Sequence, residues 1–177
     1  MAQLDKRVFL IGMMGSGKSF WARKLAGHYN VPWFDTDQMI ERQAGMPIRE
    51  IFSLKDGECI FREMERALLR ETEWPEACII ACGGGLPCFH QNMEYMLQLG
   101  MVVWLDPGSR VIADRLWGEK SQRPLVAVCA SFDDLQMKIG SLIAERNSWY
   151  QLAHAVIHLP DPDIGSFLAV LEPREIG

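Results

Sequence analysis

The 177-residue chain has no long uninterrupted run of apolar residues, although hydrophobic residues make up 49% of it. A transmembrane helix needs roughly 18 or more consecutive apolar residues, so we expect no membrane span and no membrane partner. The segment from Met1 to Arg7 lacks the apolar stretch of a secretory signal peptide. Internal repeats, low-complexity segments and linker-like stretches are also absent. These absences favour a single globular domain over residues 1–177, located in the cytoplasm.

The cysteines are few in number and irregularly spaced. Five cysteines are an odd number, which excludes complete internal pairing, and none forms a C-x-x-C pair. Cys78, Cys82 and Cys88 lie close together, but no histidine pair completes a zinc set. We therefore expect reduced thiols that pack as small buried hydrophobes. An excess of positive charge is lacking too, since the formal net charge is −5. This balance argues against a protein that coats nucleic acid.

Short apolar runs alternate with helical patterns along the chain. The predicted strands are Val8–Ile11, Val31–Phe34, Ala77–Ala81, Met101–Leu105 and Ala155–Leu159. Helical spacing predicts helices over about 18–29, 37–45, 47–57, 58–73, 92–99, 109–117, 133–150 and 166–171. Parallel neighbours need crossover connections, so this order predicts an α/β fold with three layers, α/β/α, around a five-stranded parallel sheet. Ligands of such sheets bind beyond the carboxyl ends of the strands.

The segment from Gly12 to Ser19 fits the phosphate-loop pattern G-x-x-x-x-G-K-[ST] and lies between a predicted strand and a predicted helix. Its glycines allow backbone N–H groups to converge on phosphate oxygens, and the helix adds the positive end of its dipole. Lys18 would approach the β and γ phosphates, and the Ser19 hydroxyl would bind Mg²⁺. The alternative is a glycine-rich turn with a solvated lysine. No N-K-x-D sequence for reading guanine is present, which favours ATP.

Two carboxylates, Asp35 and Asp37, flank Thr36 directly after the second predicted strand. Beside a magnesium–phosphate site, one could hold the water shell of the metal while the other accepts a hydrogen bond from the attacking hydroxyl. Either could instead cap the helix that follows, a position in which aspartate is common. The residues alone leave both interpretations open.

Two arginines on predicted helices have an ordinary alternative explanation. Arg62 lies four residues after Glu58 and three before Glu65, a spacing suited to exposed ion pairs. Arg146 is adjacent to Glu145 and has a similar alternative. Neither is assigned a function by spacing alone.

Arg123 has a different setting, within the long polar stretch Gly118–Ser131. A structureless loop of this length is often functional. Loops that close over phosphates often bring an arginine to neutralise the charge that develops during transfer. We therefore expect residues 118–131 to form a lid.

Six motifs stand together in one order and spacing. They are Gly12–Ser19, Asp35–Asp37, Gly57–Glu65, Gly83–Gly85, Arg123–Leu125 and Glu145–Tyr150. In combination they resemble the shikimate kinase family over nearly the whole chain, from about Val8 to Leu159. The resemblance implies a P-loop fold of the nucleoside-monophosphate-kinase type, with sheet order 2-3-1-4-5, a lid and an acceptor-binding region at about 35–65. It also implies transfer of phosphate from ATP, with Mg²⁺, to the 3-hydroxyl of shikimate in aromatic amino-acid biosynthesis, and we expect a monomer.

The resemblance further implies a role for each matching residue. The catalytic residues would be Lys18, Asp37 and Arg123. The nucleotide would contact Gly15, Ser16, Gly17, Lys18, Ser19, Phe20, Arg115 and Arg123. The acceptor would contact Asp37, Arg62, Gly83, Gly84, Gly85 and Arg146. The metal would be held by Ser19, with Asp35 in its outer shell.

The sequence departs from the family pattern at several places, including two beside the phosphate loop and the triple glycine. Phe20 stands where a small hydroxyl residue is usual, so one side-chain contact to phosphate is lost. Leu86-Pro87-Cys88 follows the triple glycine, where another sequence is common, and this could alter the turn. Two other functions remain as alternatives: a kinase of another polyol acid such as gluconate, and a nucleotide-binding protein without activity. The absence of a histidine near residues 35–37 disfavours the first, and the presence of the catalytic residues disfavours the second.

Overall fold

The fold is known from a computed structural model that describes residues 3–118, 129–158 and 160–172. The strands are β1 (Arg7–Ile11), β2 (Trp33–Asp35), β3 (Cys78–Ala81), β4 (Met101–Leu105) and β5 (Ala155–Ile157). The helices are α1 (Lys18–Tyr29), α2 (Thr36–Ala44), α3 (Ile48–Ser53), α4 (Gly57–Glu71), α5 (Asn92–Leu99), α6 (Ser109–Trp117), α8 (Phe132–Tyr150) and α9 (Ile164–Leu171), with a 3₁₀ turn, η1, at Leu86–Cys88.

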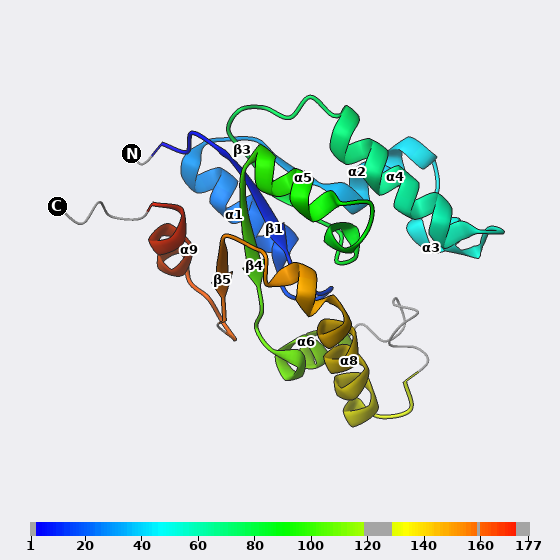
Figure 1. Cartoon of the computed structure of the whole chain (residues 1–177). Coiled ribbons are helices and arrows are strands. Elements are labelled where there is room, and N and C mark those ends of the chain that lie inside the picture. The colour runs from blue at the N-terminus through cyan, green and yellow to red at the C-terminus, as the bar shows by residue number, and fades with distance from the viewer. Residues whose placement is uncertain (1–2, 119–128, 159, 173–177) are drawn as a thin grey trace.

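The five strands form one parallel sheet in the order β2-β3-β1-β4-β5 (Figure 1). The predicted α/β class and strand order are therefore confirmed. In the register of the central strands, Phe9 lies beside Ile80 of β3 and Val102 of β4. All three side chains are fully buried, as expected for a parallel sheet that helices cover on both faces.

The two faces of the sheet have different helical covers because successive strand residues point to opposite sides. On one face, Val8 and Leu10 pack with the inner sides of α1 and α9. On the other face, Phe9 and Ile11 pack with α4, α5 and the end of α8. The three predicted layers are thus present, and the sheet forms the middle one.

Two smaller helical groups extend from the sheet. Helices α2, α3 and α4 enclose their own apolar cluster around Ile40, Ile51 and Phe61. Helices α6 and α8 pack on one another and on Met13, which places them beside the loop after β1. Figure 1 shows the α2–α4 group and the α6–α8 pair at different ends of the molecule.

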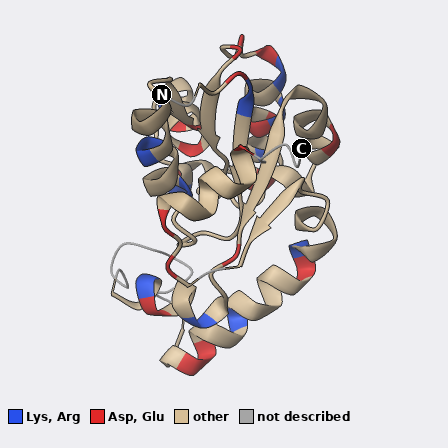
Figure 2. Ribbon diagram, turned by 90° about the vertical axis from the view of Figure 1, so that its left-hand side faces the viewer, with Lys and Arg blue, Asp and Glu red and all other residues tan. Residues whose placement is uncertain are grey.

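The positions of charged residues are concentrated on the helices and loops, and the strands carry almost none (Figure 2). No helix in the described parts of the chain is both long enough and apolar enough to span a bilayer.

Several element boundaries differ from those that the sequence predicts. The helix expected over 47–57 ends at Ser53, because Leu54 is extended, with ψ of 158°; Asp56 then adopts a left-handed conformation, with φ of 60°, before α4 begins. The turn η1 was not predicted, and it is closed by backbone hydrogen bonds from Leu86 to Gly83 and from Cys88 to Gly85. The strand predicted to extend to Leu159 ends at Ile157, and residue 159 lies outside the described ranges.

Candidate active site

The phosphate loop connects β1 to α1 and depends on glycine at three positions. Gly12, Gly15 and Gly17 have φ angles of 136°, 76° and 99°, a region that side-chain-bearing residues rarely adopt. Within the loop, the Ser16 N–H donates to the Met13 carbonyl at 3.1 Å. The loop thus wraps around the N-terminus of α1, where unpaired N–H groups and the helix dipole favour an anion.

Lys18 lies inside this loop instead of extending into solvent. Its ammonium group donates to the carbonyls of Gly12 and Met13, each at 2.9 Å. Burial lowers the pKa of Lys18 to about 8, although Asp37 acts in the opposite direction. At neutral pH the amine therefore remains mainly protonated and is already folded over the loop. The alternative of a solvated lysine is wrong.

Asp35 combines two of the possibilities that the sequence leaves open. Its Oδ1 accepts hydrogen bonds from the backbone N–H groups of Asp37 and Gln38, at 3.1 and 3.3 Å, and so caps α2. Its Oδ2 accepts a hydrogen bond of 2.5 Å from the Ser19 hydroxyl. The cap fixes the carboxylate, and the second oxygen lies directly beside the phosphate loop.

Asp37 is in the first turn of α2 and is the carboxylate that the cap leaves unpaired. Its Oδ1 is buried and finds no hydrogen-bond partner among the described residues. Burial raises the pKa of Asp37 to about 6; Asp35 adds to this effect, and Lys18 opposes it. A buried acceptor without a donor is costly in a folded protein. The oxygen is therefore suited to receive a hydrogen bond from a ligand.

The triple glycine after β3 is where the predicted acceptor residues converge. A methyl group at Gly83 would lie 2.5 Å from Asp37 Oδ1, and one at Gly84 would lie 3.3 Å from Arg146 Nη1. At Gly85 it would lie 2.5 Å from Arg62 Nη1. Each glycine thus faces a different predicted site residue at a distance that leaves no room, or little room, for a side chain. These positions need glycine for close approach and not for a positive φ.

Arg62 is buried, with only 9% of its surface exposed, so the interpretation of it as a member of exposed ion pairs is wrong. Nη1 donates to Glu65 at 2.7 Å, and Nη2 approaches Glu58 at 3.5 Å. Its Nε is buried and has no partner among the described residues. Burial raises the pKa of Glu65 to about 7, even though Arg62 lowers it. The guanidinium is therefore held firmly while one of its donors remains available.

Arg146 approaches the triple glycine from α8, where its Nη1 lies 3.4 Å from the sulfur of Met13 in the phosphate loop. One turn later, the fully buried Tyr150 donates its hydroxyl proton to the Gly84 carbonyl at 2.6 Å. Burial raises the pKa of Tyr150 to about 12, so it remains a donor. Helix α8 thus connects the phosphate loop to the glycine turn.

A cavity of about 780 Å³ unites the nucleotide and acceptor sides. Among the residues that line it are the loop from Gly15 to Phe20 except Ser16, together with Asp35, Asp37, Gly84 and Arg115. Arg62 and Arg146 are not among its lining residues; Arg146 lies against its Gly84 wall, and Arg62 lies against the adjacent Gly85. Arg115 Nη1 donates to the carbonyls of Gly15 and Ser16, both at 3.1 Å, while Nη2 donates to Pro160. Phe20 has an exposed ring.

One predicted catalytic residue cannot be placed. Arg123, with most of the predicted lid at 118–131, lies outside the described residues. The other predicted site residues lie around the cavity or the triple glycine. Three further residues have structural roles that the sequence reasoning did not assign: Glu65, Tyr150 and Thr36, whose hydroxyl accepts the Gly83 N–H at 2.8 Å. All three residues lie within the motifs Asp35–Asp37, Gly57–Glu65 and Glu145–Tyr150, and this position is the signal by which the sequence could have identified them.

The oxygen atoms at this site have the chemistry of a magnesium site. The Ser19 hydroxyl and the Asp35 carboxylate lie side by side at the phosphate loop. In the described ranges, no group of three or more His, Cys, Asp or Glu side chains is placed to hold a metal ion. Magnesium in nucleotide sites commonly takes one or two protein oxygens and completes its shell with phosphate and water. The pair therefore fits Mg²⁺ that arrives with a nucleotide.

Comparison with known sequences identifies one family. The family model for shikimate kinase matches residues 14–163. The shikimate kinase of Bacteroides fragilis is 37% identical over 150 residues, which cover 85% of this chain and 83% of that protein. The shikimate kinase of Microcystis aeruginosa is 40% identical over 156 residues, which cover 88% of this chain and 78% of that protein.

Solved structures give the same result. A crystal structure of shikimate kinase from Bacteroides thetaiotaomicron superposes with a TM-score of 0.83 at 34% identity and covers 94% of both chains. Shikimate kinase from Acinetobacter baumannii in complex with shikimate gives a TM-score of 0.79 at 32% identity, over 93% of this chain and 88% of that one. A gluconokinase from Sinorhizobium meliloti is only 16% identical, with a TM-score of 0.55, so it shares the fold alone.

Proposed function

The chain belongs to the shikimate kinase family, and we propose how its residues carry out the ATP-dependent phosphorylation of shikimate. The observation that carries the proposal is the triple glycine, where Gly83, Gly84 and Gly85 bring one carboxylate and two guanidinium groups together beside the phosphate loop. Shikimate is a ring with a carboxylate and several hydroxyls, so it needs cations at one end and a hydrogen-bond acceptor at the other.

The nucleotide would occupy the phosphate-loop side of the cavity. Backbone N–H groups of the loop and the N-terminus of α1 would bind its phosphates. Lys18, already folded over the loop, would exchange its carbonyl partners for phosphate oxygens. Arg115 lines the same cavity and would lie against the base. Phe20 also lines this cavity and would contribute its backbone N–H, although its ring supplies no hydroxyl.

The acceptor would be anchored by its carboxylate. Arg62 has a buried Nε–H without a partner among the described residues, and its fork is suited to bidentate binding of a carboxylate. Arg146 would provide the second cation from α8, beside Gly84. Because the glycines have no side chains, the ring of the acceptor can approach their backbone closely. The ring hydroxyls would then point toward Asp37.

Asp37 would hold the hydroxyl that attacks the γ-phosphorus. Its Oδ1, which has no partner in the described part of the chain, is an acceptor for the hydroxyl proton, and its raised pKa makes the carboxylate more basic than an exposed aspartate. Phosphoryl transfer passes through a loose transition state, so positioning and charge neutralisation supply most of the catalysis. Lys18 would neutralise charge on the transferred group.

Mg²⁺ and the lid complete the proposed site. When bound, Mg²⁺ supplies charge neutralisation to the β and γ phosphates. The Ser19 hydroxyl would be its protein ligand, and Asp35 would orient that hydroxyl and a coordinated water. Arg123, in the proposed lid at 118–131, would add a further cation on the phosphates.

The setting of the protein is also part of the proposal. We place it in the cytoplasm as a monomer, where phosphorylated shikimate enters aromatic amino-acid biosynthesis. The side chains of Cys59, Cys78, Cys82 and Cys88 are free thiols, which suits a reducing compartment.

The test of the acceptor assignment is the variant Arg62→Ala, assayed by steady-state ADP release with each substrate varied separately. Its KM for shikimate should rise by about 10- to 150-fold, the loss of a hydrogen bond to a charged group, while its KM for ATP stays within twofold. Arg66→Ala is the matched control, since Arg66 is an exposed arginine one turn along the same helix and pairs with Glu63. A raised KM for ATP with an unchanged KM for shikimate would contradict the assignment.

A further inference from the structure

The segment after the triple glycine brings an aromatic ring onto Arg62. Phe89 follows the turn η1, and the Arg62 Cζ lies 4.2 Å from the centroid of its ring. The ring is 36% exposed, whereas the guanidinium beneath it is buried. At this distance a cation and the face of an aromatic ring attract one another. Nothing in the phosphate-transfer chemistry described above accounts for this contact.

The surroundings of the Arg62 guanidinium leave it little freedom. The backbone of Gly85 is so close that an added Cβ would lie 2.9 Å from Cζ. Glu65 accepts from Nη1, and the buried ring of Phe61 lies 5.3 Å from Cζ. Phe89 is the most exposed of these neighbours. It lies over the guanidinium without taking up a hydrogen-bond donor.

We propose that Phe89 is a positioning residue for acceptor binding, because its ring holds the Arg62 guanidinium in the orientation that presents Nε–H to a carboxylate. The proposal rests on the proposed role of Arg62. A rigid fork binds a carboxylate more tightly than a mobile one, since less side-chain freedom is lost on binding. The effect of Phe89 should therefore fall on acceptor affinity and not on the nucleotide.

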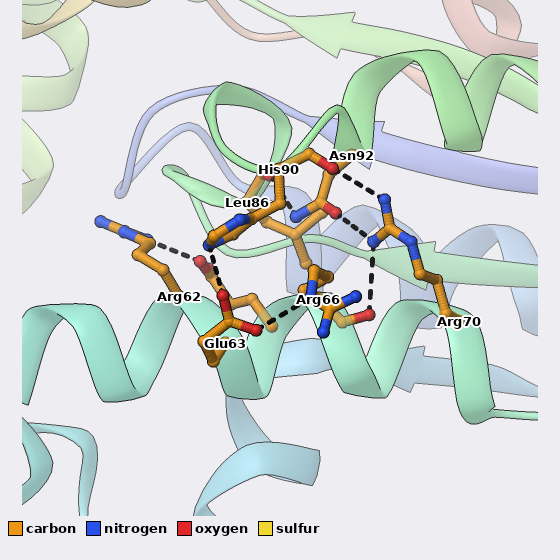
Figure 3. Close-up of polar contacts among 8 residues, drawn as sticks. Arg62, Glu63, Arg66, Arg70, Leu86, His90 and Asn92 are labelled. Carbon is orange, nitrogen blue, oxygen red and sulfur yellow. Dashed lines mark hydrogen bonds and ion pairs between the residues drawn. The ribbon is translucent and has the colours of Figure 1, made fainter.

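The position of Phe89 is itself fixed by contacts with α4. Figure 3 shows Arg70 extending from this helix to Asn92 and to the backbone of His90. Both hydrogen bonds are 2.7 Å long. The fully buried Asn92 in turn donates to the Leu86 carbonyl at 3.0 Å.

Further contacts also hold the segment that carries Phe89 in place. The Asn92 N–H donates to the Phe89 carbonyl at 2.9 Å. His90 and Gln91 both adopt positive φ, 51° and 56°, which turns the chain sharply after Phe89. His90 also lies 3.4 Å from Glu63 of α4. The segment that carries Phe89 is therefore attached to the same helix that carries Arg62, so the ring and the guanidinium keep their relative position.

The experiment measures equilibrium dissociation constants for shikimate and for ATP by calorimetry, each without the other substrate. Phe89→Leu keeps an apolar side chain but removes the ring, and Phe89→Tyr keeps the ring. A cation–π contact between a buried cation and a partly exposed ring corresponds to about five- to tenfold in affinity. We expect Phe89→Leu to weaken shikimate binding by that factor, Phe89→Tyr to restore it to within twofold, and ATP binding to stay unchanged in both.

The same leucine substitution is then made in an Arg62→Ala background, which forms a double-mutant cycle. If Phe89 acts through Arg62, the leucine substitution should change shikimate affinity by less than twofold there. Equal losses in both backgrounds, or no rescue by tyrosine, would overturn the proposal. If Arg62→Ala alone leaves shikimate affinity intact, the role of Arg62 in the proposed function fails instead. A normal loss for Arg62→Ala with no loss for Phe89→Leu refutes only the inference about Phe89.

Discussion

Substitution of Gly85 by alanine tests whether acceptor binding depends on the position of Arg62. Gly85 has φ of −90° and ψ of −16°, a conformation that alanine adopts without strain. Any effect of Gly85→Ala must therefore come from what the new methyl group meets. It would lie 2.5, 2.8 and 2.9 Å from Nη1, Nη2 and Cζ of Arg62.

The size of the effect follows from these distances. Ordinary van der Waals contact begins near 3.4 Å, so Nη1 has to move by 3.4 − 2.5 = 0.9 Å. The Glu65 hydrogen bond and the buried setting of Arg62 resist that movement. A displacement of this size removes a charge-assisted hydrogen bond to the substrate carboxylate, which contributes about 1.5–3 kcal/mol. The KM for shikimate should therefore rise by about 10- to 150-fold.

The assay is ADP release with shikimate and ATP varied separately, together with a thermal melt of each variant. The KM for ATP should stay within twofold, because the three atoms nearest to the new methyl group all belong to Arg62 and none to the phosphate loop. Gly27→Ala is the matched control: Gly27 lies in α1, a methyl group there would meet no described residue within 4 Å, and alanine favours the helix. If Gly85→Ala is well folded and its KM for shikimate is unchanged, Arg62 does not bind the acceptor from the position described.

Three further substitutions test other contacts of the site. Asp37→Asn should lose most turnover. Because the pKa of Asp37 is raised from 3.8 to about 6, the stability of the wild-type protein falls as pH rises through that interval. The variant should therefore melt at a higher temperature than wild type at pH 8, and this difference should shrink at pH 4. Equal gains at both pH values would contradict the burial of an unpaired carboxylate. Phe20→Thr restores a hydroxyl at the phosphate loop and should lower the KM for ATP by about two- to tenfold in steady-state assays; an increase would mean that the ring itself contacts the nucleotide. Thr36→Val leaves the buried Gly83 N–H without its acceptor and should cost about 1–3 kcal/mol, or about 2–10 °C in the melting temperature; an unchanged melt would refute that role.

Local patterns in the sequence predict the sheet and the phosphate loop well, because both depend on short-range features. Five apolar runs, each short and bounded, are sufficient to predict buried parallel strands. The phosphate loop requires glycine at positions with positive φ, and the sequence has glycine at each of them: Gly12, Gly15 and Gly17. Boundaries are less predictable where one residue changes the path of the chain, as Asp56 does with its left-handed conformation.

The acceptor side is harder to predict because its contacts join residues far apart in the chain. The spacing of Arg62 from Glu58 and Glu65 is equally suited to an exposed ion pair and to a buried one. What decides between them is Gly85, 23 residues away, whose missing side chain makes room for the guanidinium. The same holds for Phe89, whose contact with Arg62 depends on the hydrogen bonds that Arg70 and Asn92 form. Neither contact leaves a periodic signal in the sequence.

The most direct test of the central claim is a coupled assay of ADP release, with Mg²⁺ and ATP, across four conditions: shikimate, quinate, gluconate and no acceptor. A site built from two guanidinium groups and one unpaired carboxylate at a triple glycine predicts rapid ADP release with shikimate and a rate near background with gluconate and without acceptor. Release that does not depend on shikimate, or that is faster with gluconate, would contradict the assignment of this site.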